Sequence, residues 1–106
     1  MSDDYQIEIP QSFIALFMAA GRAKPSLPRA ELAQRYELCE DLAHMLTATA
    51  QEMLHGLGIT EADVLQRCYQ GLCTEPAVVS VAEAGWVICR LAELSAWPLP
   101  VSLLSA

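Results

Sequence analysis

The chain has 106 residues, enough for one domain and too few for two. Hydrophobic residues make up 54% of it and charged residues 18%, so the chain is too apolar to stay disordered. The formal net charge is −7, and residues 36–106 hold nine acids against only Arg67 and Arg90. Such an acidic body argues against nucleic acid as a partner, because phosphate binding depends on Lys and Arg.

Neither a membrane segment nor an export signal is evident in the sequence. The first residues lack the basic segment of a signal peptide, and the uncharged stretches are too short to span a bilayer. We therefore expect a cytoplasmic protein that does not bind a membrane.

The first predicted helix runs from Gln11 to about Ala20, with Pro10 in its first turn. Its apolar residues point in every direction, which is typical of a helix buried on all sides. Gly21 ends this helix, and residues 21–27 form a loop. We expect residues 1–8 to be loose or extended.

The longest predicted helix runs from Pro28 to about Leu57, where Gly56 and Gly58 supply the C-terminal stop. It would be roughly 43 Å long, whereas a compact domain of this size is only roughly 34 Å across. We expect a kink, an elongated fold, or a second chain that covers the overhang. The apolar positions recur in helical steps of three and four. They are Leu32, Tyr36, Cys39, Leu42, Ala43, Leu46, Ala50, Met53 and Leu57, with Leu38 and Met45 widening the stripe.

Two capping boxes predict the starts of two further helices. Thr60 with Asp63 opens a helix to about Leu72, and Ser80 with Glu83 opens another to about residue 96. The second box is the better one, because its acid is a glutamate.

Four helices with short connections predict an all-α fold, a small four-helix bundle with one long central helix. We expect a single domain over residues 1–106. Pro98 and Pro100 stop the last helix, so residues 98–106 should form a loose or extended apolar tail.

One helical face carries the residue types of a metal site. Asp41 and His44 form the acid–x–x–His pattern that di-metal bundles use, and Glu40 lies one turn before His44. A complete site needs a second such pair, which only a symmetric dimer would supply. We favour a solvated polar face with a Glu40–His44 contact and no metal or cofactor. The alternative is a metal-dependent helical enzyme that uses this face across a dimer.

No motif identifies a reaction. Residues 21–26 lack the second glycine and the Lys-Ser/Thr pair of a phosphate loop, and no Gly-x-Ser-x-Gly elbow occurs. Spacing alone leaves a nucleophile–His–acid set open. Cys68 and Cys73 are too far apart for a CxxC pair and have no histidine nearby, so we interpret the four cysteines as reduced structural thiols.

Surplus apolar surface in so small a chain indicates an interface. We expect a homodimer or a tight complex with another protein. The anchors that we predict for it are large apolar side chains: Phe13, Phe17, Tyr36, Trp97 and Leu99. Residues 35–41 form either a docking surface for a basic segment or ordinary surface charges. The favoured function is a non-enzymatic interaction module, and an acidic mimic of nucleic acid is a further alternative.

Three segments carry a family resemblance. They are residues 35–43 (RYELCEDLA), residues 58–72 (beginning GITE) and residues 83–97 (beginning EAGWV). Together, over about residues 9–97, they resemble a family of small uncharacterised proteins, chiefly from proteobacteria, whose members are often labelled "ATPase with chaperone activity". The shared pattern contains no catalytic signature, so it implies no site residues. With no phosphate loop for hydrolysis, the resemblance implies an adaptor or accessory of a chaperone machine.

Overall fold

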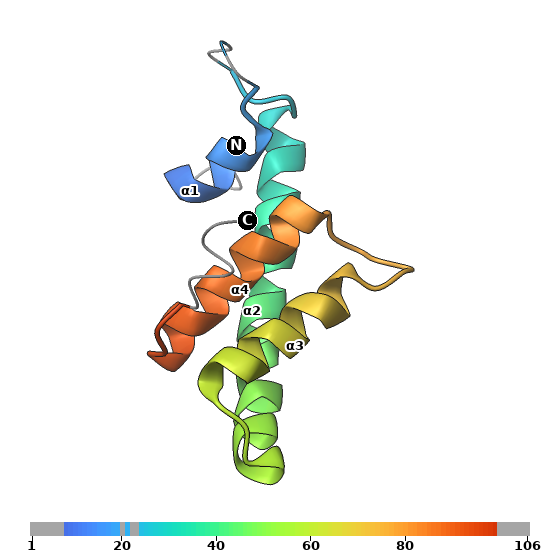
Figure 1. The fold of residues 1–106 in the computed structure, drawn as a ribbon. Coiled ribbons are helices and arrows are strands. Elements are labelled where there is room, and N and C mark those ends of the chain that lie inside the picture. Colours follow the sequence, from blue (N-terminus) through green and yellow to red (C-terminus); the bar gives the residue numbers. More distant parts are fainter. Residues whose placement is uncertain (1–7, 20, 22–23, 100–106) are drawn as a thin grey trace. The chain divides into compact units, whose positions relative to one another are not determined.

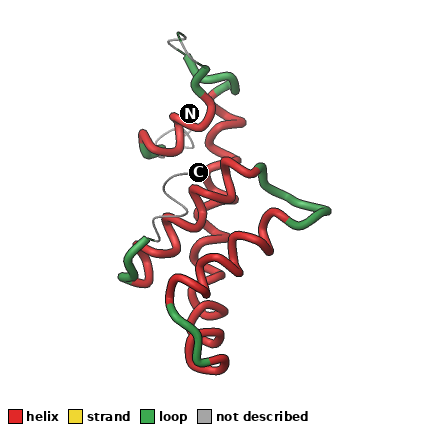
Figure 2. The backbone as a smooth tube through the Cα atoms, in the orientation of Figure 1, coloured by secondary structure: helices red, strands yellow, loops and turns green. Residues whose placement is uncertain are grey.

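The computed structural model describes residues 8–19, 21 and 24–99 of the chain. Every regular element in these residues is helical, as Figures 1 and 2 show. The helices are α1 (Gln11–Ile14), the 3₁₀ helix η2 (Ala15–Phe17), α2 (Arg29–Leu57), α3 (Glu61–Cys73) and α4 (Val81–Ser95). The prediction of a small all-α bundle with one long helix is confirmed.

The two capping boxes lie at the starts of α3 and α4, and they differ in completeness. The hydroxyl oxygen of Thr60 accepts a hydrogen bond from the Asp63 amide at 3.1 Å. Ser80 accepts one from the Glu83 amide at 3.1 Å, and the Glu83 carboxylate accepts one from the Ser80 amide at 2.8 Å. Only the Ser80 box is therefore reciprocal, as the glutamate at its third position predicts.

The first helix is shorter than predicted. α1 ends at Ile14 and tightens into η2, and Met18 is already extended. The Phe17 carbonyl accepts a hydrogen bond from the Ser26 amide at 2.7 Å, so the following loop closes back onto the helix end. A 3₁₀ turn of this kind is a common way to satisfy terminal carbonyl groups. The predicted end at Ala20 lies outside the described residues.

The chain divides into two compact units, one up to Leu38 and one from Cys39 on, and α2 passes through both. In the first unit, the Phe13 ring packs against two other rings, with centroids 5.5 Å from Phe17 and 5.6 Å from Tyr36. Two units that share a helix can still fold together, so the single domain stays a prediction. The predicted tails, 1–8 and 98–106, lie mostly outside the described residues.

In the second unit, α3 and α4 pack on each other and on the C-terminal part of α2 (Figure 1). α3 and α4 supply most of this core. Its buried members are Ala50, Val64, Leu65, Cys68, Ile88, Leu91 and Ala92.

Two residues of the predicted α2 stripe are exposed instead. Met45 lies two residues after the buried Ala43, about 200° around the helix, and so faces the opposite side. Leu57 is the last residue of α2, one turn beyond Met53 and Leu54, which still pack against the core. Within the described residues, no helix is long and apolar enough to cross a bilayer.

Candidate functional site

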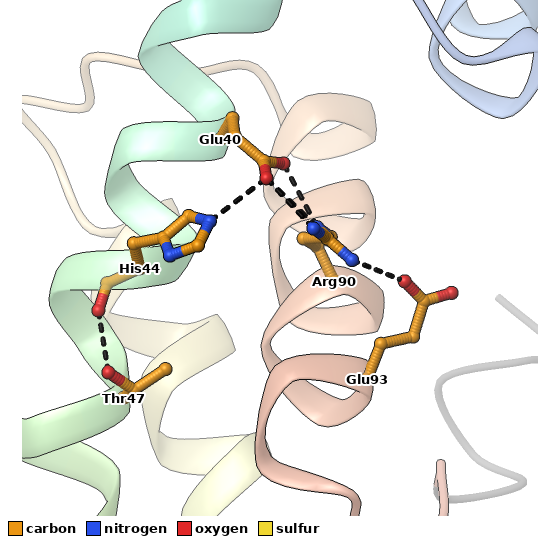
Figure 3. A network of polar contacts seen from close by, with 5 residues as sticks. All are labelled: Glu40, His44, Thr47, Arg90 and Glu93. Atoms are coloured by element: carbon orange, nitrogen blue, oxygen red, sulfur yellow. Dashed lines mark hydrogen bonds and ion pairs between the residues drawn. The ribbon is translucent and has the colours of Figure 1, made fainter.

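Four charged or polar side chains meet between α2 and α4 in the second unit, and we call them the Glu40 cluster (Figure 3). They are Glu40 and His44 on α2, and Arg90 and Glu93 on α4. Arg90 donates from Nε to both oxygens of Glu40, at 3.0 and 3.1 Å, and from Nη2 to Oε2 at 3.0 Å. Its Nη1 donates to Glu93 at 3.0 Å, and His44 Nε2 lies 3.0 Å from Glu40 Oε2.

The helical period explains the two contacts that lie within a single helix. Glu40 and His44 are four residues apart, Arg90 and Glu93 are three apart, and each pair therefore shares one helix face. The forked contact between Arg90 and Glu40 joins residues fifty positions apart, and only the packing of α2 beside α4 creates it. Such bidentate pairs are the stronger class of surface ion pair.

The contacts in the cluster shift the pKa values of Glu40 and Arg90. The hydrogen bonds from Arg90 lower the pKa of Glu40, desolvation opposes them, and His44 adds to the lowering. Glu40 and Glu93 in turn raise the pKa of Arg90. Glu40 is therefore an ionised acceptor held by a guanidinium, which is the arrangement of a structural contact between helices.

The predicted metal ligands are only partly brought together. The Glu40–His44 contact is confirmed, whereas Asp41 is exposed and takes no part in the cluster. A metal ion at Glu40 would have to displace the Arg90 donors. In the described part of the chain, no three His, Cys, Asp or Glu side chains gather in a way that could hold a metal ion.

Sequence reasoning missed Arg90 and Glu93. One signal was present, because Arg90 is one of only two cations in the acidic residues 36–106. An isolated cation in such a segment is expected to pair with an acid, although the sequence does not identify which one.

The cysteines are free thiols. Burial raises the pKa of Cys68 and of Cys89, and the charge of Glu93 adds to the shift of Cys89. Both are therefore protonated at neutral pH and are poor nucleophiles. This is consistent with the structural role that the sequence predicts for the cysteines.

The five predicted interface anchors are placed differently from one another. Phe13 is fully buried, whereas Phe17, Tyr36, Trp97 and Leu99 are partly exposed. Trp97 and Leu99 pack against the core of the second unit. No contact with a second chain tests these anchors, so their interface role stays a prediction.

Among the described residues, four other large apolar side chains are exposed: Met45, Leu57, Val78 and Val81, at 58–68%. Met45 belongs to a row of exposed α2 residues that we call the outer face. The outer face consists of Asp41, Met45, Ala48, Glu52 and His55. Their steps of four and three place them along one side of the helix.

Comparison of the chain with protein-family models, with curated proteins and with solved structures gives no match. The family resemblance of the three sequence segments stays a prediction.

Proposed function

We propose that the protein is a non-enzymatic protein–protein interaction module. The observation that carries this proposal is the exposure of Met45, Leu57, Val78 and Val81 on a unit that has a well-packed core. Apolar side chains that stay exposed beside such a core gain most by docking a partner. Three of the four lie on helices, so a partner would meet them largely preorganised.

The polar side chains support the same conclusion, because the described contacts use them to hold the fold. Both Glu40 oxygens accept hydrogen bonds from Arg90, and Arg90 also binds Glu93. Cys68 and Cys89 are protonated thiols in partly or fully buried positions. These groups stabilise helix packing and need no substrate to satisfy them.

Charge indicates the kind of partner. Residues 39–106 hold eight acids against two bases, and Arg90 is engaged by two of those acids. The exposed surface of the second unit is therefore strongly acidic, and it favours basic protein surfaces. The resemblance to chaperone-labelled proteins supports an adaptor or accessory role beside a cytoplasmic chaperone.

The homodimer that the sequence predicts is part of this proposal. In the second unit, Trp97 and Leu99 keep exposed apolar area that a two-fold partner could cover. Sedimentation at micromolar concentration tests it. A dimer that dissociates on Trp97→Ser supports this surface, and a monomer for the unmodified chain contradicts it.

Affinity capture from the native cell tests the interaction function. The bait is the full chain, and the test variant replaces Met45, Leu57, Val78 and Val81 with serine. All four side chains are exposed, so the variant should fold. We expect it to lose the proteins that the unmodified chain retains.

A matched control separates the apolar side chains from general surface change. It replaces Gln34, Thr49, Gln51 and Gln70, which are exposed and polar, with serine. The control should retain the captured proteins. The proposed function would be contradicted if the variant without the four exposed apolar side chains captured the same proteins as the unmodified chain. Substrate turnover by the purified chain would also contradict it.

A further inference from the structure

We infer that the outer face of α2 binds a cationic amphipathic helix from another protein. This inference rests on the proposed interaction function and names the partner class and the surface. Met45 and Ala48 form the apolar centre of the face, and Asp41 and Glu52 lie one turn to either side of it. From Asp41 to Glu52 the pattern is acid, apolar, apolar, acid along one helix side, and His55 ends the face one turn further on.

The spacing suits helix-on-helix packing. The steps from Asp41 to Met45, Ala48 and Glu52 are four, three and four, which is the repeat by which helices meet along a shared seam. Ala48 is small and allows a second helix axis to approach closely, and the exposed Met45 can insert beside it. Asp41 and Glu52 stand about 16 Å apart along the axis.

The two carboxylates are available to a partner. Among the described residues, neither Asp41 nor Glu52 has an ion-pair partner within the chain. The nearby Glu40 is different, because Arg90 already neutralises it. A bound helix with Lys or Arg opposite both ends of the face would therefore complete the charge pattern.

A second copy of the chain fits this face poorly. In a parallel pair, Asp41 would meet Asp41 of the copy, and in an antiparallel pair it would meet Glu52. Either arrangement brings like charges together without a cation between them. Self-association therefore uses another surface, such as that of Trp97 and Leu99.

The complementary sequence follows from the face itself. A partner helix that matches the face has two basic residues eleven positions apart. Its apolar residues stand four and seven positions after the first of these basic residues. The test uses a synthetic Ala-rich helical peptide with Lys and Leu at these positions. A second peptide with Glu in place of both Lys residues is its control. Binding to the full chain is measured by fluorescence anisotropy.

We expect the Lys peptide to bind and the Glu peptide not to bind. Asp41→Asn with Glu52→Gln should weaken binding about tenfold, since each exposed ion pair contributes modestly. Met45→Ala should weaken it by about tenfold through lost apolar contact. The control variant is Gln70→Lys, which changes one charge on the exposed side of α3. It should change the affinity for the Lys peptide less than about twofold.

Three results would overturn the inference. The first is that the Lys peptide fails to bind. The second is that the double variant Asp41→Asn with Glu52→Gln binds the Lys peptide as well as the unmodified chain does. The third is that Met45→Glu dissociates a dimer of the chain, which would show that a second copy occupies the face.

The capture experiment with the variant that replaces the four exposed apolar residues separates these results from failure of the proposed function. If that variant loses its partner while the Lys peptide does not bind, the interaction function stands and this surface is wrong. If that variant keeps its partner, the proposed function itself fails.

Discussion

Ala96 follows the last residue of α4 and adopts a left-handed backbone conformation, with φ of 59°. The Ala96 amide donates to Glu93 and the Trp97 amide donates to Ala92, at 3.1 and 2.8 Å. This pair of hydrogen bonds is a Schellman motif, in which the left-handed position usually holds glycine. The motif also positions Trp97 against the core that contains Ala92.

Ala96→Gly should stabilise the protein by about 0.5–1 kcal/mol. Glycine removes the steric cost of the left-handed conformation, and part of that gain is offset by a more flexible unfolded chain. Urea unfolding followed by circular dichroism measures the difference. An unchanged or lower unfolding midpoint would contradict the strain that we assign to Ala96.

Glu40 makes stability depend on pH. Arg90 holds the pKa of Glu40 below its ordinary value of 4.5, so the ionised form is favoured in the folded state. The stabilisation is complete above about pH 4.5 and is lost as pH falls through the lower, folded-state pKa. Relative to Glu40→Gln, the unmodified chain should be more stable at neutral pH, and the difference should vanish in acid.

Glu52→Gln is the matched control for this pH dependence. Glu52 lies on the same helix, is exposed, and has no ion-pair partner among the described residues. Its substitution removes no ion pair of the described residues, so at neutral pH it should change the free energy of unfolding less than Glu40→Gln does. A Glu40→Gln difference that stays constant from neutral to acid pH would disprove the ionic contact.

At the scale of the helices, the two N-terminal caps are expected to contribute unequally. Ser80→Ala breaks a reciprocal, part-buried capping box and should destabilise the fold by about 1–2 kcal/mol. Thr60→Ala removes a single exposed hydrogen bond and should cost about 0.5–1 kcal/mol. Thermal or urea unfolding compares them, and a larger effect at Thr60 would contradict the assignment.

The helices could be predicted because their signals are local. Caps at Thr60 and Ser80, and Gly58 with its positive φ, act within one or two turns of the residues that they order. The Arg90–Glu40 contact could not be predicted, since it depends on how two distant helices pack. Met45 was wrongly assigned to the buried stripe for a related reason. The sequence of α2 alone does not fix how wide its buried face is, and only the packing of α3 and α4 shows which side is covered.

At the scale of the whole molecule, the chain has only six basic residues and no phosphate loop with which to hold a triphosphate. Of the six, Arg90 is bound by Glu40 and Glu93, while Lys24 is exposed in the first loop. Phosphoryl transfer depends mostly on positioning of phosphates, metal ion and water. We predict that the purified chain with Mg²⁺ releases no phosphate from ATP. Turnover that disappears on Lys24→Ala would contradict this.

The central claim is that the chain acts by binding a basic protein through the outer face of α2. A photoreactive amino acid in place of Met45, with a matched one at the exposed Ala62 of α3, tests it in the native cell. We predict a discrete crosslinked product from position 45 and none from position 62. Mass spectrometry should locate the crosslink in a helix with basic residues on both sides of its apolar positions. No product from position 45, or equal products from both positions, would contradict the claim.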